Sequence, residues 1–332
     1  YGYKYVVQPL PVDHFAVVMA GHDQVKLTWK AVNDTLEPTA VPEKYIVYKR
    51  IGNGDFDNGT VVKKPVFVCK IPTDQVVSFK VTAFNKGGES FPSEILSAGI
   101  SSQSTVKPVL VINGFDRLSA PDDFRSSDDK EAGFLADIDN GVPYKTSINY
   151  VGRMKEFRRS IPWTDDDSGG FGDSYGNYER MTIAGNTFDY PALHGQAIMS
   201  AGYSFVSANK SAAVEGELLN TDDYSAVDLI LGKEKQTKLG RPGVTPLRFK
   251  TFDTDLQKSI TTYCKNGGRI FASGSYIASD LWFNPLAPAK DSDKVFAQDI
   301  LKYKWRDNRA AIDGKIKYSA SPLTTKEGEF TY

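Results

Sequence analysis

The hydrophobic pattern of this 332-residue chain changes its period near residue 108. Before that point apolar and polar residues alternate, so that Val25, Leu27 and Trp29 fall on one face of an expected strand. After it, continuous apolar runs such as 109–112 are separated by segments of helical period. A strand with one buried face is typical of an antiparallel sheet, whereas a strand apolar on both faces is typical of a parallel sheet covered by helices. The chain is therefore expected to combine two architectures in series.

The first hundred residues predict an all-β sandwich. Runs with the length and alternation of strands occupy residues 24–30, 45–50, 66–71 and 77–84. The strings VKLTWKAV, YIVYKR and VSFKVTAFNKGGESFPSE resemble a fibronectin type III domain over residues 12–100, after an N-terminal extension of residues 1–11. The resemblance implies that Trp29 lies in the core and that the domain acts as a spacer or an interaction module, because such a fold does not by itself define a function.

The rest of the chain predicts a doubly wound α/β sheet, since its strands alternate with helices. Apolar runs typical of buried parallel strands occupy residues 109–112, 226–232 and 269–275. Segments of helical period occupy residues 191–208 and 251–265. The expected organisation is a polar linker at 101–107, an α/β domain at 108–323 with a long insertion at 119–185, and a tail at 324–332.

Several segments of this second part resemble the class I glutamine amidotransferase-like, or flavodoxin-like, fold. They are VLVINGFDRL, ALHGQAIMSAGY, YSAVDLILGKE and TDLQKSITTYCKNGGRIFASGSYIASDL. The whole arrangement resembles secreted multidomain proteins of gut bacteria, many of which are labelled xanthan lyases or are joined to N-acetylmuramoyl-alanine amidase modules. The resemblance implies a secreted, periplasmic or cell-surface location, a glycan or cell-wall polymer as partner, and further domains that flank this chain.

Composition excludes several other classes. The chain has 40 Lys and Arg against 41 Asp and Glu, so a net charge of −1 gives no reason to expect nucleic acid as a partner. No run approaches the ~20 apolar residues of a membrane span, so no integral membrane span is expected. Cys69 and Cys264 fall in different predicted domains, and with only three histidines no zinc site of usual spacing can form. We therefore expect no metal and no cofactor.

Ligands of open α/β sheets bind at the carboxyl ends of the strands. That rule selects the loops that follow the three predicted strands, and the candidate ligand-binding residues in them are Asn113, Gly114, Arg117 and Ser273. The same edge offers a candidate catalytic set, with Ser275 as nucleophile, His194 as base, and Asp116 or Glu234 as the group that orients the base.

The residues around Ser275 argue against such a site. A nucleophile elbow requires G-x-S-x-G, but Ser273 and Ile277 stand where the glycines belong. The amidotransferase resemblance would supply a cysteine nucleophile, yet no cysteine follows a predicted strand. In the alternative interpretation, the serines hold a turn and cap a helix at 276–281, His194 begins a helix, and Asp116 pairs with Arg117.

The insertion at 119–185 is rich in Asp, Gly and aromatic residues. The segment 165–173 follows the spacing of a calcium-binding loop until its twelfth position, where Gly176 replaces the required Glu. Trp163 begins an aromatic set that can stack on the faces of sugars; alternatively, these side chains pack the loop onto the domain.

Three hypotheses follow. The first is a secreted protein for polysaccharide or cell-wall handling, with a fibronectin type III spacer and a degenerate, non-catalytic α/β domain. The second is a polysaccharide- or peptidoglycan-degrading lyase or hydrolase with its site at the carboxyl ends of the strands. The third is a structural or adhesive surface protein. Convergence of His194, Asp116, Glu234 and Ser275 in one cleft would favour the second.

Overall fold

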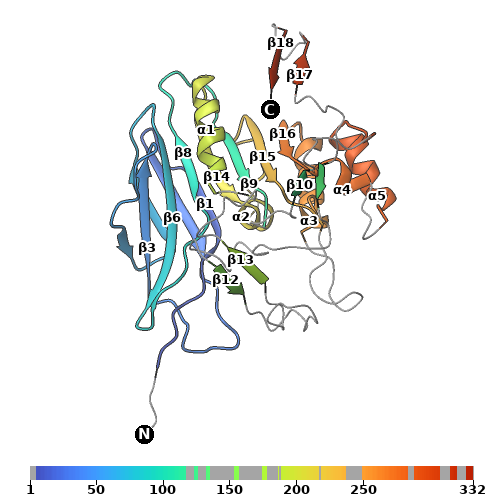
Figure 1. The fold of residues 1–332 in the computed structure, drawn as a ribbon. Coiled ribbons are helices and arrows are strands. Elements are labelled where there is room, and N and C mark those ends of the chain that lie inside the picture. Colours follow the sequence, from blue (N-terminus) through green and yellow to red (C-terminus); the bar gives the residue numbers. More distant parts are fainter. Residues whose placement is uncertain are drawn as a thin grey trace.

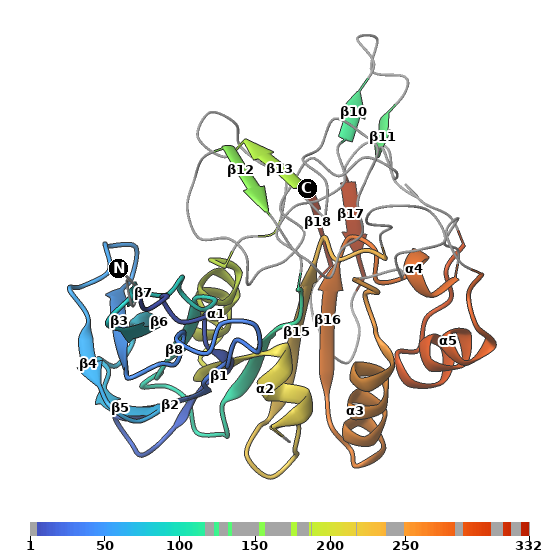
Figure 2. The ribbon, with the colours of Figure 1, turned by 90° about the horizontal axis from the view of Figure 1, so that it is seen from below.

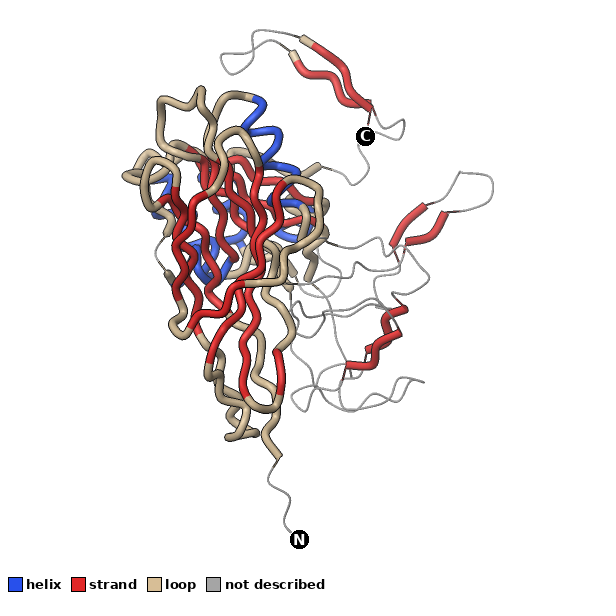
Figure 3. The backbone as a smooth tube through the Cα atoms, turned by 90° about the vertical axis from the view of Figure 1, so that its left-hand side faces the viewer, coloured by secondary structure: helices blue, strands red, loops and turns tan. Residues whose placement is uncertain are grey.

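The structure is a computed structural model with a large sheet at its centre (Figure 1). It describes residues 5–116, 123–125, 132–134, 153–156, 174–177, 186, 188–216, 218–236, 249–282, 288–306, 315–319 and 327–331. Within these residues one sheet system of twelve strands joins the N-terminal and C-terminal parts of the chain. Figure 3 shows strands filling the central body, with the helices behind them in that view.

The N-terminal part is an antiparallel sandwich of two layers. One layer contains β1 (Asp13–Met19), β2 (Gln24–Lys30) and β5 (Val66–Lys70). The other contains β4 (Thr60–Val62), β3 (Lys44–Ile51), β6 (Val76–Asn85) and β8 (Leu96–Gly99), and β7 (Gly88–Glu89) extends β6 as a hairpin. This pairing confirms the predicted fibronectin type III-like sandwich.

Alternation along the strands builds the core of this sandwich. On β2, Val25, Leu27 and Trp29 are buried while the polar residues between them are more exposed. The Trp29 ring meets the edge of Tyr45, with ring centroids 5.4 Å apart. The predicted role of Trp29 as a core residue is confirmed, because its side chain is 4% exposed.

The C-terminal part contains four parallel strands. They are β9 (Val109–Asn113), β14 (Phe205–Asn209), β15 (Ala226–Gly232) and β16 (Ile270–Gly274), and they lie side by side in the order β14-β9-β15-β16. The helices between them are α1 (Tyr190–Ser200), α2 (Lys210–Glu215) and α3 (Thr254–Lys265). Figure 2 shows α2 and α3 beside this group of strands.

The two faces of the parallel strands have separate cores. Leu110 and Ile112 of β9 pack in one cluster with Leu256 of α3. Val111, between them, packs in a second cluster with Ala192 of α1. Successive residues of a strand point to opposite faces, so α1 covers one face and α3 the other.

The prediction of one helix over 191–208 was wrong in its second half. Helix α1 ends at Ser200, Gly202 takes a positive φ of +86°, and β14 follows at Phe205. All five residues of β14 are buried. An apolar run buried on every side has no period that separates a strand from a helix, so the sequence pattern merged the two elements.

Strand β14 belongs to both parts of the molecule. On one side it is parallel to β9; on the other it pairs antiparallel with β1 and β8. The Ser207 hydroxyl accepts a hydrogen bond of 2.8 Å from the Ser97 backbone N–H and donates one of 2.6 Å to the Ser97 carbonyl. The predicted linker at 101–107 therefore joins strands of one sheet, and the predicted domain division stays a prediction.

The remaining described elements are short. They are β10 (Asp123–Arg125), β11 (Ala132–Phe134), β12 (Arg153–Glu156), β13 (Ser174–Asn177), α4 (Ser279–Trp282), α5 (Asp291–Val295), a π-helical turn (Phe296–Ile300), β17 (Lys315–Tyr318) and β18 (Gly328–Thr331). Cys69 on β5 and Cys264 on α3 are both unpaired thiols. Among the helices of the described segments, none has the length and apolar character needed to cross a bilayer.

Candidate functional site

The loops selected from the sequence lie together at the carboxyl edge of the parallel strands. The Gly114 N–H donates to the Ile230 carbonyl over 2.8 Å, and the Ser275 N–H donates to the Gly232 carbonyl over 2.7 Å. Gly114 is needed for this approach, because a Cβ there would lie 2.8 Å from Leu229 Cδ1. The three loops are thus held to one another by backbone hydrogen bonds.

Lys210 is the charged centre of this edge. It begins α2, and its Nζ forms ion pairs with Asp116 and, at 3.0 Å, with Asp253. The backbone N–H of Asp116 donates to Glu234 Oε2 over 3.2 Å, which brings a third carboxylate to the group. Burial alone would lower the pKa of Lys210, but the carboxylates of Asp116, Asp253 and Glu234 outweigh it and raise the pKa above its ordinary value. Lys210 is therefore a fixed cation at neutral pH.

A second polar network joins α4 to residues that follow β15 and precede α3. Asp280 is 4% exposed, and its Oδ2 accepts hydrogen bonds from the Thr251 N–H, the Thr251 hydroxyl and the Gln236 N–H, at 2.9, 2.9 and 3.1 Å. The Thr251 hydroxyl also lies 3.0 Å from the Glu234 carbonyl. These bonds fix the backbone that carries Glu234.

His194 has a different partner from the ones that the sequence suggested. It lies one turn inside α1, and its Nδ1 is 2.8 Å from Oδ2 of Asp228, in the middle of β15. The structure records no hydrogen bond or ion pair of His194 with Asp116, Glu234 or Ser275. Asp116 and Glu234 meet at Lys210 instead, so the four candidate catalytic residues divide into separate groups.

Ser275 lies in the turn that leaves β16. Helix α4 begins at Ser279, later than the predicted helix at 276–281, and residues 275–278 form turns before it. Ser273 is the fourth residue of β16 and pairs in register with Ile230. Among the described residues, neither serine makes a hydrogen bond to a histidine, so the structure shows no activated nucleophile at this edge.

Two buried side chains of the parallel strands have polar atoms without hydrogen-bond partners. Asn113 ends β9 with a fully buried side chain, and neither atom of its amide is bonded; Oδ1 of Asp228 is also unbonded. In the part of the chain that the structure describes, no group of three His, Cys, Asp or Glu side chains could hold a metal ion. The predicted ligand-binding residues Arg117 and Trp163, and the loop 165–173, lie outside the described residues.

Sequence reasoning missed Lys210 and Asp228. Lys210 follows β14, the strand that was interpreted as part of a helix, so its place at the carboxyl edge was hidden. Asp228 carried a usable signal, because a carboxylate inside an apolar run such as AVDLILG needs a buried partner. His194 supplies it.

Comparison with known proteins finds no match to a protein-family model and none to a curated protein. Among solved structures, the chain is similar to the twitchin kinase region from C. elegans, with 19% identity, 30% of this chain and 18% of that chain covered, and a TM-score of 0.27. For titin domains A168–A170 the identity is 23%, the match covers 29% of this chain and 33% of that chain, and the TM-score is 0.25. For the FN5 domain of Drosophila Lar the identity is 14%, the match covers 28% of this chain and 98% of that chain, and the TM-score is 0.23.

Likenesses of this size carry no argument about function. They span less than a third of this chain, and the chain covers only 18% and 33% of the twitchin and titin structures. The class of the N-terminal part is defined by its own strands: β1-β2-β5 in one layer and β4-β3-β6-β8 in the other. It is a fibronectin type III-like sandwich, joined edge to edge to a set of parallel strands.

Proposed function

We propose that this chain is a secreted, periplasmic or cell-surface protein for polysaccharide or cell-wall handling, whose α/β part binds a ligand without turning it over. The fibronectin type III-like sandwich acts as its spacer or interaction module. One observation carries the proposal: Asp116 and Glu234, which a serine–histidine site would use, are gathered around the Lys210 ammonium. A carboxylate neutralised by a buried cation is not available to orient His194 as a base.

The proposal includes a flavodoxin-like arrangement for the α/β part. Numbered along the chain, the parallel strands lie in the order second, first, third, fourth, which is how a flavodoxin-like sheet begins. The glutamine amidotransferase-like resemblance extends to the scaffold alone. The thiol of Cys264 lies on α3, where it packs against the core and burial raises its pKa, so it does not provide a nucleophile.

We expect the full chain to bind oligosaccharides or insoluble cell wall without cleaving them. Binding would be measured on an array of neutral and acidic oligosaccharides and by co-sedimentation with purified peptidoglycan. Cleavage would be followed by reducing-end release and by absorbance of unsaturated products, with a boiled sample as control. An absence of binding to every glycan would overturn the proposed function.

We expect Ser275→Ala to leave glycan binding and the melting temperature unchanged, because the structure shows the Ser275 backbone, and not its hydroxyl, in the contacts that hold the turn. Binding titrations and thermal unfolding of the two proteins check this. Loss of a saccharide-cleaving activity in Ser275→Ala would show that this serine is a nucleophile and would contradict a non-catalytic edge.

The bond between His194 and Asp228 favours a second candidate, a lyase or hydrolase. A carboxylate bonded to Nδ1 fixes the imidazole so that Nε2 can accept a proton from a substrate. On this alternative, His194→Ala lowers saccharide cleavage about 10²–10⁴-fold, the range of a general base. His22→Ala, at an exposed histidine of the sandwich, is the matched control. Equal cleavage by both variants would rule out this base.

A further inference from the structure

A groove runs between α3 and the pair formed by α5 and the π-helical turn, which Figure 2 shows side by side. Its cavity has a volume of about 540 Å³, within the range that holds a small ligand. One wall is a stripe of α3, whose lining residues from Thr254 to Lys265 recur every three or four positions and so share one face of the helix. Over these residues α3 rises about 16 Å, so the groove suits an elongated ligand.

Three lysines of this groove have no acidic partner. Lys258 and Lys265 extend from α3, Lys290 directly precedes α5, and all three are exposed. Among the described residues, the structure records no ion pair for any of them. A fourth lysine of the lining, Lys250, has its Nζ 2.6 Å from Oδ1 of the buried Asp293. That pair is neutral in itself, so the other three ammonium groups remain to bind an anion.

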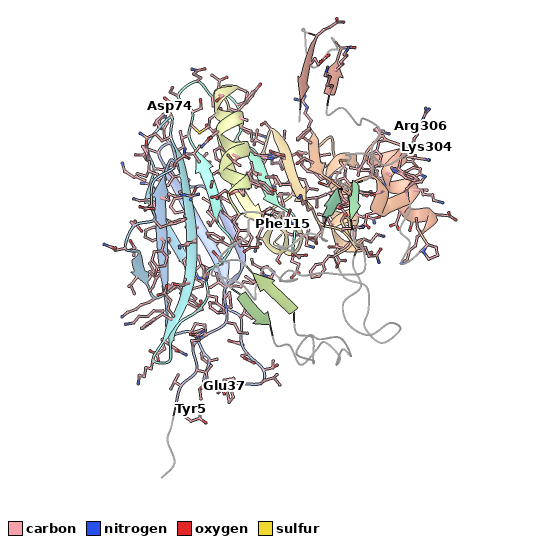
Figure 4. The ribbon with its side chains drawn as sticks, in the orientation of Figure 1. Tyr5, Glu37, Asp74, Phe115, Lys304 and Arg306 are labelled. Atoms are coloured by element: carbon pink, nitrogen blue, oxygen red, sulfur yellow. The ribbon has the colours of Figure 1, made fainter. Side chains whose placement is uncertain are left out.

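The groove carries a positive charge in a chain that is slightly negative. Its lining has four lysines against two aspartates, Asp293 and Asp299, which leaves an excess of two positive charges, whereas the whole chain has a net charge of −1. Lys304 and Arg306, which follow the π-helical turn, lie at the same end of the molecule as α5 (Figures 1 and 4). Charges of one sign gathered in a cleft attract a ligand of the opposite sign. The groove therefore favours an anionic ligand.

Threonine hydroxyls on α3 complement the lysines. Oγ1 of Thr261 donates to the Gln257 carbonyl over 2.7 Å, and Oγ1 of Thr262 donates to the Lys258 carbonyl over 3.1 Å. Because the helix engages the proton of each hydroxyl, the oxygen can only accept a hydrogen bond from a ligand. The lysine ammonium groups, in contrast, can only donate. A ligand that fits both sets carries anionic acceptors together with hydroxyl donors.

Other anionic polymers fit this lining less well. Both walls are helical, so their backbone groups are bonded within the helices and provide no sheet edge for an extended peptide. A helical peptide needs a continuous apolar groove, but of the apolar side chains in the lining only Val295 is exposed, at 54%. Single-stranded nucleic acid needs aromatic faces for its bases, and the one aromatic residue of the lining, Phe296, is 4% exposed. A saccharide with acidic groups requires none of these features.

We propose that the groove between α3 and the π-helical turn binds an acidic saccharide. Its anionic groups pair with Lys258, Lys265 and Lys290, and hydroxyls of its rings donate to Thr261 and Thr262. Lys258 and Lys265 are seven residues apart, about 10 Å along α3, so they bind separate anionic groups of one saccharide chain. The inference deepens the proposed function and rests on it, because it names the class of ligand and its site. Carboxylated and sulfated saccharides share this chemistry, and the test distinguishes them.

The test is calorimetric titration of the full chain with four probes of similar length. They are a carboxylated oligogalacturonate, a sulfated heparin fragment, a neutral cello-oligosaccharide and an oligoglutamate peptide. Wild type should bind an acidic saccharide more tightly than the neutral one. The groove variant reverses three charges and should weaken binding of that saccharide at least tenfold; its changes are Lys258→Glu, Lys265→Glu and Lys290→Glu.

Two further variants separate a site in the groove from general attraction. A control reverses three exposed lysines of the sandwich, gives the same change in net charge and should leave the affinity unchanged; its changes are Lys26→Glu, Lys63→Glu and Lys64→Glu. Thr261→Val removes one hydroxyl and no charge, and should weaken binding about three- to tenfold, the usual effect of one hydrogen bond. The replaced lysines are exposed, so these variants should fold, and their melting temperatures check this.

The outcomes separate this site from the proposed function. A loss in the groove variant but not in the control supports the site with either acidic saccharide, and the tighter of the two identifies the anionic group. If wild type binds a glycan and both the groove variant and Thr261→Val bind it as tightly, the site is overturned and glycan handling stands. Equal losses in the groove variant and the control would also overturn the site.

Two other results would overturn the ligand class. They are binding of the neutral saccharide alone and binding of oligoglutamate without any saccharide. If wild type binds no glycan and no cell wall, the proposed function fails and the inference fails with it.

Discussion

Replacing Lys210 by methionine is expected to lower the free energy of unfolding by about 3–5 kcal/mol, the range for removing one partner of a buried ion pair. Methionine fills a similar volume but leaves the carboxylates of Asp116, Asp253 and Glu234 close together without their cation. Chemical denaturation at neutral pH measures the loss.

Lys70→Met is the matched control for this change. Lys70 pairs with Asp23 over 2.6 Å, but both side chains are exposed, so solvent screens the pair and its loss should change the stability little. Equal stability of wild type and Lys210→Met would contradict a cluster held together by charge. A large loss in Lys70→Met would show that the method responds to any removed lysine.

The Lys210 cluster also predicts the response of the protein to alkaline pH. Because the folded state raises the pKa of Lys210, its contribution is complete below the ordinary lysine pKa of about 10.4 and is lost as pH rises through the folded-state value. The stability difference between wild type and Lys210→Met should therefore be constant near neutral pH and shrink above about pH 10.4. A difference that persists unchanged at higher pH would contradict this linkage.

Gly195→Ala is expected to destabilise the protein by about 1–3 kcal/mol, the cost of overpacking a core. On an exposed helix this substitution would raise the free energy of unfolding by about 1 kcal/mol, since alanine favours helix. At Gly195 the new Cβ would lie 2.0 Å from Cζ of Phe205, so α1 or β14 must move. We expect the overlap to outweigh the gain in helix propensity. Chemical denaturation of the purified variant shows whether its free energy of unfolding falls or rises.

A double mutant separates the overlap from other causes. Phe205→Leu removes the ring that a Cβ at position 195 would meet, so its combination with Gly195→Ala should cost less than the sum of the single changes, with a coupling of about 0.5–3 kcal/mol. Gly54→Ala, in an exposed turn where the nearest atom lies 3.5 Å away, is the neutral control. If the stability losses of the two single changes simply add in the double mutant, the Cβ at position 195 does not overlap the Phe205 ring, and the expected coupling is contradicted.

Much of the fold could be predicted because alternation and capping are local signals. The strand 24–30 was predicted with the bounds that β2 has, and the helix before Asn266 was predicted because Gly267 and Gly268 follow its apolar period. Strand β14 could not be predicted, since it is short, buried on every side and close to α1. Its pairing with β1 and β8 is a long-range contact that no local pattern records.

The candidate site was predicted in part. The strand-end rule placed Asn113, Asp116 and Glu234 at one edge, and the backbone bonds of the loops place them there. The rule could not assign roles, because roles depend on partners from other elements. The sequence proposed Asp116 or Glu234 as the carboxylate that orients His194, but the carboxylate that His194 meets is Asp228, which precedes the strand end by several residues.

The position of β14 between the two parts has a consequence for any mechanical or evolutionary separation of them. Separating the two parts at residues 101–107 would leave the edges of β1, β8 and β14 unpaired at once, and unpaired strand edges favour association with other chains. The sandwich is therefore not an independent module that could be separated from the C-terminal part without exposing strand edges. Tension applied to one half would reach the other through shared backbone bonds, so the molecule should yield as a unit.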